Sequence, residues 1–249
     1  MKSIKNKLEI FGLQPIIEAI KSGKEFDKIF IKKGLQGQLS SDLKYLIKKN
    51  NIPSKFVPLE KINRLTKKNH QGVFGFISPI NFHKVGEIIM KTFEEGKTPI
   101  LLMLDRITDV RNFGAITRSA DNFGVDAIII NKFGSAQINS DAIKTSAGAI
   151  YKVPICREDN LVNCISYLKK SGLVVISCSE KESKNITDVN LKNPILIILG
   201  SEKNGISSDI LKASDEKIKI PTYGKIDSLN VSVACGISLY EISRQRSLT

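Results

Sequence analysis

Six short apolar runs in the second part of the chain restrict its fold more than any other feature. They are rich in β-branched residues and leucine, show little alternation with polar residues, and lie at residues 99–104, 126–130, 152–155, 173–178, 194–199 and 217–220. This pattern is typical of strands that are buried on both faces of a sheet. Stretches with helical character separate most of them, at residues 112–123, 140–149, 160–170, 207–213 and 228–245. From residue 98 the sequence therefore predicts an α/β domain with a mostly parallel sheet.

The first 80 residues have a different pattern of apolar and polar residues, which predicts a small α/β unit. Helices are expected at residues 15–21 and 42–49, and strands at 28–31, 55–57 and 73–78. A linker at 78–81 and a connecting helix at 84–95, ended by Gly96, follow. We therefore expect three segments: a first domain at 1–79, a linker with its connecting helix at 80–97, and a second domain at 98–249.

Positive charge is concentrated in the first of these domains. Of a net charge of +13, residues 1–80 contribute +10, from 16 Lys or Arg and 6 Asp or Glu. The remaining residues contribute only +3. A basic module joined to a nearly neutral one favours a polyanion held by the first and a smaller ligand handled by the second. Lysines that merely keep helix faces soluble are the alternative interpretation.

Several classes of protein are disfavoured. No apolar run approaches the ~18 residues of a membrane span, and the N-terminal residues do not resemble a secretory signal, so a cytoplasmic protein is expected. The four cysteines show no C-x-x-C spacing and there are only two histidines, so no metal site is predicted. Neither G-x-G-x-x-G nor a Walker A sequence is present, which disfavours dinucleotide-binding Rossmann enzymes and nucleotide triphosphatases.

In parallel sheets the ligand lies beyond the carboxyl ends of the strands, and polar segments follow three of the predicted strands. In the first segment, residues 105–118, Asn112 is a candidate helix cap. Arg111 and Arg118 are two helical turns apart, so they share a face near the start of that helix. Such a helix start is suited to phosphate, although an ordinary capped helix with surface arginines has the same sequence pattern.

The other two polar segments carry glycines and potential caps. Residues 200–206 place two glycines around polar residues directly after a strand, which lets a ligand approach the backbone or simply forms a turn. In residues 221–234, Ser228 is expected to cap the last helix and Asn230 to project toward a ligand. The apolar stripe of this helix consists of Leu229, Val233, Ile237 and Tyr240.

Taken together, these segments resemble the SpoU/TrmH family of RNA ribose 2′-O-methyltransferases, within the SPOUT superfamily. The matching motifs are Asn112-Phe113-Gly114-Ala115-Ile116 with Arg118, Ile198-Leu199-Gly200-Ser201-Glu202 with Gly205-Ile206, and Ile220-Pro221 with Gly224 and Ser228 to Ala234. Phe11-Gly12 and His70-Gln71-Gly72-Val73 are similar to the substrate-binding domain of the branch that methylates a guanosine in large-subunit (23S) ribosomal RNA. The chain departs from the family pattern at Thr222, where Met is common, and at Val110, where Pro is common.

The resemblance implies a trefoil knot in the C-terminal domain, a homodimer, RNA as the partner and S-adenosylmethionine as the cofactor. It implies catalytic roles for Asn112, Arg118, Glu202, Ser228 and Asn230. It implies cofactor contacts at Thr145, Gly200, Ile220, Pro221, Ser228 and Leu229. Because a guanidinium stays protonated, we expect Arg118 to hold a phosphate, with the two asparagines orienting the ribose and Glu202 as an alternative proton acceptor.

Other interpretations remain open from the sequence. A tRNA ribose methyltransferase, or a ribosome modifier that confers antibiotic resistance, would carry the same motifs. A non-catalytic RNA-binding ribosome assembly factor would keep the basic module, but its motifs should have decayed. A nucleotide- or phosphometabolite-binding α/β enzyme would explain the helix-terminal arginines but not residues 1–80.

Overall fold

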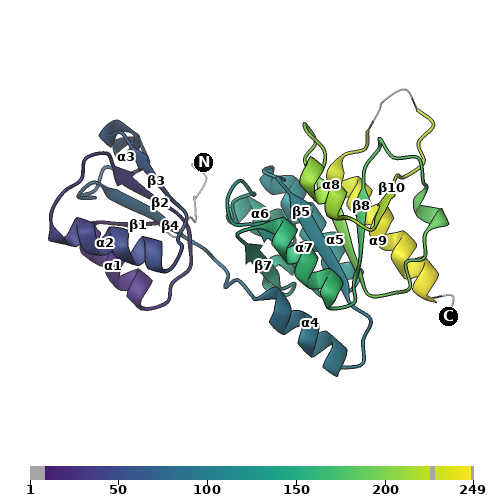
Figure 1. Ribbon diagram of the computed structural model, residues 1–249. Coiled ribbons are helices and arrows are strands. Elements are labelled where there is room, and N and C mark those ends of the chain that lie inside the picture. The colour runs from purple at the N-terminus through teal and green to yellow at the C-terminus, as the bar shows by residue number, and fades with distance from the viewer. Residues whose placement is uncertain (1–8, 225–227, 248–249) are drawn as a thin grey trace. The chain divides into compact units, whose positions relative to one another are not determined.

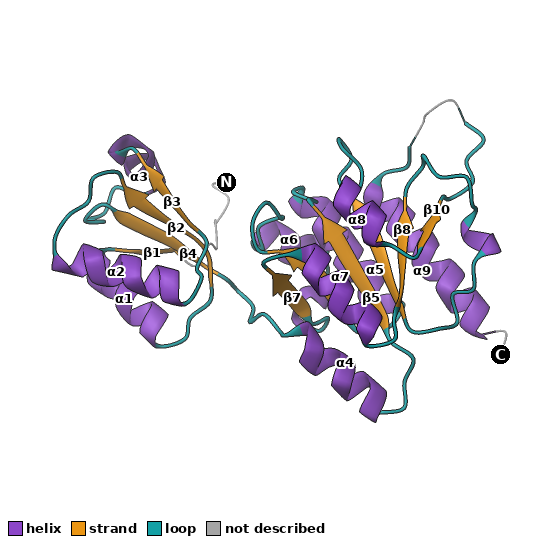
Figure 2. Cartoon of the chain, viewed as in Figure 1, coloured by secondary structure: helices purple, strands orange, loops and turns teal. Residues whose placement is uncertain are grey.

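The chain forms two compact units, one made mainly of residues up to Asn81 and the other mainly of residues from Phe82 onward. The structure is a computed structural model that describes residues 9–224 and 228–247. Figure 1 traces the chain through both units, and Figure 2 shows that helices and strands alternate in each. None of the helices within the described residues is long and apolar enough to cross a membrane.

The N-terminal unit is a mixed four-stranded sheet with helices on both faces. Its strands run in the order β1-β4-β2-β3, with β2 and β3 parallel and the other pairs antiparallel. Its elements are β1 (Glu9–Phe11), α1 (Leu13–Lys21), β2 (Phe26–Lys32), α2 (Gln38–Lys49), β3 (Ser54–Val57), α3 (Leu59–Leu65) and β4 (Val73–Ile77). The sequence predicted neither β1 nor α3, because elements of three and seven residues are too short to establish a periodic pattern.

Each face of this sheet has its own core. On one face, α1 and α2 pack Ile16, Ile20 and Leu43 against Ile29 and Ile31 of β2. On the other face Phe30, Phe74 and Phe76 form a cluster that α3 covers through Ile62. The alternation of side chains along β2 assigns its isoleucines to the first face and Phe30 to the second.

The second unit is built on a parallel sheet of six strands, as the sequence predicts. The strand order is β10-β8-β9-β5-β6-β7, and every neighbouring pair is parallel. Its strands are β5 (Ile100–Asp105), β6 (Ala127–Asn131), β7 (Ile155–Glu158), β8 (Val174–Cys178), β9 (Ile195–Gly200) and β10 (Glu216–Ile218). Its helices are α4 (Val85–Glu94), α5 (Val110–Asn122), α6 (Ser140–Thr145), η1 (Ala149–Tyr151), α7 (Leu161–Lys170), η2 (Ile186–Asp188), α8 (Ser208–Ala213) and α9 (Val231–Ser247).

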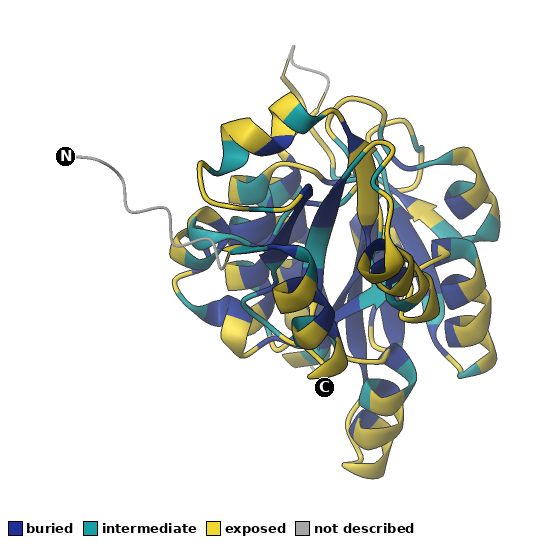
Figure 3. Cartoon of the chain, turned by 90° about the vertical axis from the view of Figure 1, so that its left-hand side faces the viewer, coloured by how far each residue is buried: buried dark blue, intermediate teal, exposed yellow. Residues whose placement is uncertain are grey.

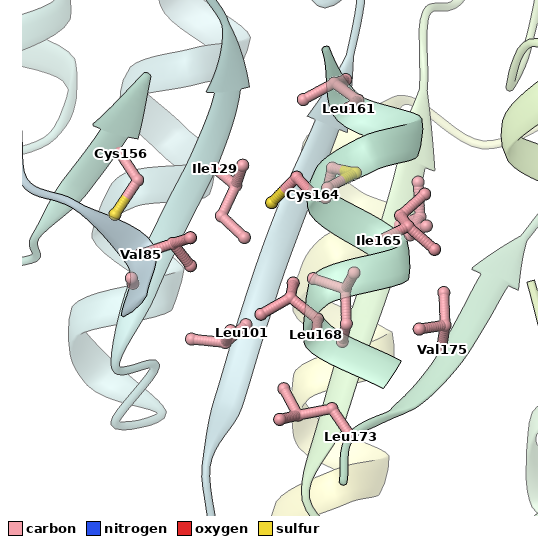
Figure 4. Packing of buried hydrophobic residues seen from close by; sticks show 14 of the residues in the cluster. Val85, Leu101, Ile129, Cys156, Leu161, Cys164, Ile165, Leu168, Leu173 and Val175 are labelled. Carbon is pink, nitrogen blue, oxygen red and sulfur yellow. The ribbon is translucent and has the colours of Figure 1, made fainter. Parts of the chain in front are cut away.

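Helices cover both faces of this sheet, which explains why its strands lack alternation. On one face α4, α7 and α8 contribute to a cluster that includes Leu101, Ile129 and Leu168 (Figure 4). On the opposite face lie α5 and α9, which pack against each other (Figure 1). In Figure 3 the strands are mostly dark blue, while the helices turn yellow surfaces outward. Both Leu101 and Leu102, which point to opposite faces, are fully buried.

Three predicted boundaries are wrong for identifiable backbone reasons. The helix expected at residues 140–149 ends at Thr145, because Ala147 (φ 50°) and Gly148 (φ 85°) adopt left-handed conformations. The strand expected at 152–155 is β7, which begins only at Ile155, after η1 and Pro154. The strand expected at 217–220 is β10, which ends at Ile218, because Lys219 pairs instead with Asn185 in an isolated bridge.

The segment between β8 and β9 bonds to the chain just after β10 and to the end of α9. Ile186 donates its backbone N–H to Lys219 O at 2.9 Å, and Lys219 donates to Lys184 O at 2.8 Å. At the far end of α9, Gln245 bonds to Val189 and Leu191. Arg246 donates hydrogen bonds to four backbone carbonyls. The C-terminal helix is thus fastened to a loop that precedes it by about 50 residues.

Candidate active site

The carboxyl ends of the strands form a hollow edge on the C-terminal unit. Two adjoining cavities of about 60 and 110 Å³ lie there. Both are lined by Cys178, Ser179, Glu180, Ser228, Leu229 and Ala234. The loop from Leu199 to Ile206 borders the larger cavity, and Ile220 and Thr222 border the smaller one. The polar segments that follow β9 and β10 therefore meet at one place, as the parallel sheet requires.

A cluster of three polar side chains joins the segments that follow β5, β9 and β10. Asn112, in the first turn of α5, donates from Nδ2 to Glu202 Oε1 at 2.6 Å. Asn230, just before α9, donates from Nδ2 to the same Glu202 oxygen at 3.0 Å and to Asn112 Oδ1 at 3.1 Å. These residues are 28 to 118 positions apart in the sequence. Three of the five predicted catalytic residues thus form one hydrogen-bonded group, which we call the Asn–Glu–Asn cluster.

Asp109, rather than Asn112, caps the helix that carries the first of these residues. Asp109 Oδ1 accepts the backbone N–H of Asn112 at 2.7 Å, so the prediction of an Asn112 cap is wrong. Asp109, three residues earlier, satisfies one free N–H group of the helix start and leaves the Asn112 side chain available for Glu202. The glycine that follows is needed for close packing, because a Cβ on Gly114 would lie 2.7 Å from Thr145 Cβ.

The last helix is also capped by a residue other than the expected one. It begins at Val231, and Asn230 Oδ1 accepts the N–H of Ser232 at 2.9 Å and its hydroxyl at 2.6 Å. Asn230 therefore serves as the cap, and the prediction that Ser228 would do so is wrong. Ser228 lies two residues earlier and lines both cavities. The cap fixes the Asn230 side chain, so that its amide points at Asn112 and Glu202.

Arg118 is not part of the Asn–Glu–Asn cluster. Its side chain is exposed on α5, and within residues 9–224 and 228–247 no hydrogen bond or ion pair engages its guanidinium. Its backbone carbonyl accepts a hydrogen bond from Asn122 at 2.8 Å. Because the Arg118 guanidinium is permanently charged and has no partner among the described residues, it is available to bind an external anion.

The loop after β9 is held in a narrow shape by its own backbone. A Cβ on Gly200 would lie 2.2 Å from the carbonyl carbon of Gly205, so no other residue fits there without moving the loop. Gly205 itself has a φ of 62°. Gly205 N donates to Ser201 O at 2.8 Å and closes the turn. Both glycines of this motif are therefore required by the fold of the loop.

Two residues at the end of β5 fasten this loop, and sequence analysis missed them. Asp105 is 3% exposed and accepts the backbone N–H of Ser207 at 2.7 Å. Arg106 binds Asp105 through Nε and Nη2 and also reaches Gly205 O at 3.3 Å. Arg106 has a φ of 56°, a conformation that residues with a side chain seldom adopt. Nothing in the residue types signals this turn.

The end of β8 supplies a further wall that sequence analysis also missed. Cys178, Ser179 and Glu180 line both cavities, and they follow a buried strand as the other site segments do. The same strand-end rule could have found them. Burial raises the pKa of the Cys178 thiol to about 11, so it is neutral at physiological pH and contributes a soft, uncharged surface.

The remaining predicted cofactor contacts divide into two groups. Gly200, Ile220, Ser228 and Leu229 line the cavities. Thr145 and Pro221 are absent from the lining formed by the described residues. Thr145 donates from its hydroxyl to Asp141 O at 2.8 Å within α6, and it packs against Gly114 as described above.

The apolar stripe predicted for the last helix is exposed. Leu229, Val233, Ile237 and Tyr240 are 36–58% exposed, whereas Val231, Cys235, Leu239 and Ile242 are buried on the other side of the helix. The fold therefore buries the other side of α9 and leaves the predicted stripe on the surface of the chain. α9 has two apolar faces, and periodicity alone does not say which of them meets the sheet.

The site combines backbone-lined cavities with a fixed amide and carboxylate group beside them. Such cavities suit a flat, partly apolar ligand with hydrogen-bonding edges, and the amides can orient hydroxyl groups. No group of three or more His, Cys, Asp or Glu residues that could hold a metal ion occurs in the described part of the chain. The chemistry that these residues offer is orientation and charge stabilisation rather than nucleophilic attack by the protein.

Comparison with known proteins gives matches along nearly the whole chain. The family model of the SpoU rRNA Methylase family matches residues 99–240, and that for RNA 2′-O ribose methyltransferase substrate binding matches residues 10–83. A TrmH family tRNA/rRNA methyltransferase of Staphylococcus saprophyticus is 34% identical over 97% of each chain.

Solved structures match as well. The SpoU methyltransferase AviRb from Streptomyces viridochromogenes, in complex with the cofactor AdoMet, has a TM-score of 0.62 and 20% identity, covering 98% of this chain and 92% of its own. The A. aeolicus TrmH/SpoU tRNA modifying enzyme has a TM-score of 0.57 and 32% identity, covering 65% of this chain and 85% of its own.

Proposed function

The chain belongs to the SpoU rRNA methylase family and is an RNA 2′-O-ribose methyltransferase, and from that premise we propose that it transfers the methyl group of S-adenosylmethionine to a guanosine of large-subunit (23S) ribosomal RNA. The observation that carries the proposal is the intact Asn–Glu–Asn cluster beside the cavities. A non-catalytic assembly factor would have no reason to keep it. We expect the protein to act where ribosomal RNA is found, in the cytoplasm.

The cavities fit the cofactor. Ile220 and Leu229 supply apolar walls, and Gly200 brings backbone groups to the edge because it has no side chain. Ser228 adds a hydroxyl at the rim. S-adenosylmethionine, when bound, supplies a methyl group that is already activated for transfer. The protein therefore has to align the ribose oxygen and manage its proton, and alignment alone accounts for much of the acceleration of such reactions.

The cluster residues divide this work. We propose that Asn112 and Asn230 orient the ribose, and that Arg118 holds a neighbouring phosphate. Arg118 cannot act as the base, because a guanidinium stays protonated. Glu202 Oε1 already accepts hydrogen bonds from both asparagines, which favours a supporting role over that of proton acceptor. Thr145 and Pro221 act at most indirectly on the cofactor in this scheme.

The exposed stripe on α9 supports a homodimer. Val233, Ile237 and Tyr240 lie at helical spacing and are 37–58% exposed, which is unusual for large apolar side chains on one face of a helix. We propose that a second copy of the chain covers them.

Val233→Glu should convert the protein from a dimer to a monomer in light scattering. Met90→Glu is the matched control, because Met90 is 59% exposed on α4, on the opposite face of the sheet, and this variant should remain dimeric. A monomeric wild-type protein would contradict this part of the proposal.

We also propose that the N-terminal unit, residues 1–79, holds the RNA, that residues 80–97 connect, and that residues 98–249 carry the catalytic domain and its trefoil knot. The fastening of α9 to the loop between β8 and β9 is the feature that supports the knot. The connecting segment also packs on the catalytic domain, because Val85 and Ile89 of α4 are buried in the core of the second unit. A truncated protein should therefore begin at residue 82, where the second unit begins. It should bind S-adenosylmethionine and lose most of its affinity for RNA.

Mapping of ribose methylation tests the proposed substrate. In a strain that lacks this protein, one 2′-O-methyl group should disappear from 23S rRNA, and the purified protein should restore it in vitro. The similarity to a tRNA modifying enzyme favours tRNA as the second candidate, so tRNA from the same strain is mapped in parallel. A methyl group lost from tRNA alone would select that substrate, and methylation of a base would refute the reaction.

A further inference from the structure

One face of the N-terminal sheet carries a row of rings and lysines. Side chains that point to this face lie next to one another across the four strands, because Phe11 pairs with Phe74, Phe74 with Phe30, and Phe30 with Lys55. Lys28 lies two residues before Phe30 on β2 and therefore on the same face. The helix α3 lies over part of this face and adds Lys61. We call Lys28, Lys55 and Lys61 with the ring of Phe30 the lysine face.

The rings fix the position of the ammonium groups. Lys61 Nζ lies 5.3 Å and Lys28 Nζ 5.7 Å from the centroid of the same Phe30 ring. Lys68 Nζ lies 5.4 Å from the Phe11 ring. Phe30 is held in turn by an edge-to-face contact with Phe76 at 6.3 Å. Cation–π attraction thus holds flexible lysine side chains over a rigid aromatic base.

The three lysines of the lysine face have no carboxylate partner among the described residues. Within residues 9–224 and 228–247, none of Lys28, Lys55 and Lys61 forms an ion pair. Two further cations, Arg64 and Lys67, follow Lys61 closely in the sequence and are exposed. Two ammonium groups drawn to one ring repel each other, so the arrangement is most favourable when an anion lies between them.

We propose that the lysine face is where the N-terminal unit grips RNA, and that it binds the ribose-phosphate backbone rather than the bases. The inference rests on the proposed function for its partner, since an RNA substrate supplies closely spaced phosphates. Phe30 and Phe76 are only 7% and 8% exposed, so their faces are not open for a base to stack on them. The rings position charge, and the lysines neutralise phosphates without reading sequence.

A matched pair of triple variants tests the location. Lys28→Ala, Lys55→Ala and Lys61→Ala are combined in one full-length protein. Lys44→Ala, Lys48→Ala and Lys49→Ala on α2 remove the same charge from the opposite face in a second protein. Binding of a 23S rRNA transcript is measured over a range of salt concentrations. Each lost phosphate contact lowers the salt slope by about 0.7–0.9, so the first variant should lose about 2–3 in slope and roughly a hundredfold in affinity at 0.1 M salt.

The remaining measurements separate the possible outcomes. The α2 variant should bind RNA nearly as the wild type does, and equal losses in the two variants would overturn the location. Replacing the three lysines by arginine should keep the affinity, because the charge is retained.

If circular dichroism shows that the triple alanine variant is unfolded, the arginine variant and the single alanine substitutions decide instead. An unchanged salt slope in each single alanine variant would then overturn the proposal. S-adenosylmethionine binding should be unaffected in all of them. If the alanine variant loses RNA binding but the wild-type protein never methylates rRNA, this inference stands and the proposed substrate is refuted.

Discussion

The two units organise their functional residues in opposite ways. In the C-terminal unit, a few side chains from distant segments are locked together by hydrogen bonds of 2.6–3.1 Å around cavities that the backbone shapes. In the N-terminal unit, charges are spread over a sheet face, and contacts with the Phe30 ring hold two of the lysines, Lys28 and Lys61. A locked site should fail as a whole when one member is lost, whereas a spread surface should weaken by steps. The contrast can be measured, because each kind of site predicts a different size of effect for a single substitution.

The largest effect is expected in the Asn–Glu–Asn cluster. Asn230→Ala removes the amide that bonds to both Asn112 and Glu202, together with the cap of α9. Methyl transfer at saturating substrates should fall by about 10²–10³-fold, as it does when one positioned polar contact is lost in other enzymes. Asn122→Ala, which removes only a bond to the Arg118 carbonyl, is the control and should remain active. Near-normal turnover of the Asn230 variant would show that the cluster does not act as one unit.

A second large effect is expected from the loop after β9. In Gly200→Ala the new Cβ would meet the Gly205 carbonyl carbon at 2.2 Å, so the loop must shift. Because a displacement of about 1 Å in a site can cost 100-fold in rate, methyl transfer should fall by roughly that factor, and calorimetry should show weaker binding of S-adenosylmethionine. Gly23→Ala, just after α1 in the N-terminal unit, places its Cβ in open space and serves as the control. Equal cofactor binding by both variants would show that the loop is not a rigid part of the site.

A smaller and additive effect is expected from the lysine face. Lys55→Ala should weaken binding of rRNA by about fivefold at 0.1 M salt, and the effect should vanish at high salt, since one phosphate contact is removed. Combining it with Lys61→Ala should multiply the two losses. A single lysine substitution that abolished binding would show that this surface, too, is a locked site.

The smallest effect is expected for an ion pair that belongs to neither site. Hydrogen bonds from Arg244, assisted by Gln245, lower the pKa of Glu241 below its ordinary value of 4.5. A carboxyl group whose pKa is lowered on folding stabilises the protein above its unfolded pKa, and this contribution is lost as the pH falls through the folded value. Glu241→Gln should lower the melting temperature at pH 7 by roughly 1–2 °C, and this difference should shrink as the pH falls below 4.5, as followed by circular dichroism. A difference that grew toward low pH would contradict the assignment.

Sequence patterns predicted the place of the site better than its details. The rule that ligands lie beyond parallel strand ends correctly placed Gly200, Ser228 and Asn230 at one edge, because topology alone decides this. The caps were misassigned, since Asp109 and Asn230 compete locally with Asn112 and Ser228 for the same helix ends. Only the fold decides such competitions between neighbouring residues of similar chemistry.

Other features have no signature in a single sequence. The left-handed turn at Arg106 follows from its contacts with Asp105 and with Gly205, which lies 99 positions further along the chain. The two apolar faces of α9 cannot be ranked by periodicity, because both repeat at helical spacing. The lysine face depends on strand register, which brings Lys55 beside Phe30 across β2 and β3. Sequence showed that residues 1–80 are basic, but not which face carries the charge.

The position of Asn230 has a consequence for how the protein is made. Asn230, Ser228 and Leu229 complete the site, and they lie directly before α9, which follows every other element of the C-terminal unit in the sequence. A growing chain that already contains β5, β8 and β9 therefore still lacks a finished cavity. Synthesis of the 17 residues of α9 takes about 1–3 s at ordinary rates. Until this helix has left the ribosome, the site that Asn230 completes cannot form, so cofactor binding has to follow the synthesis of α9.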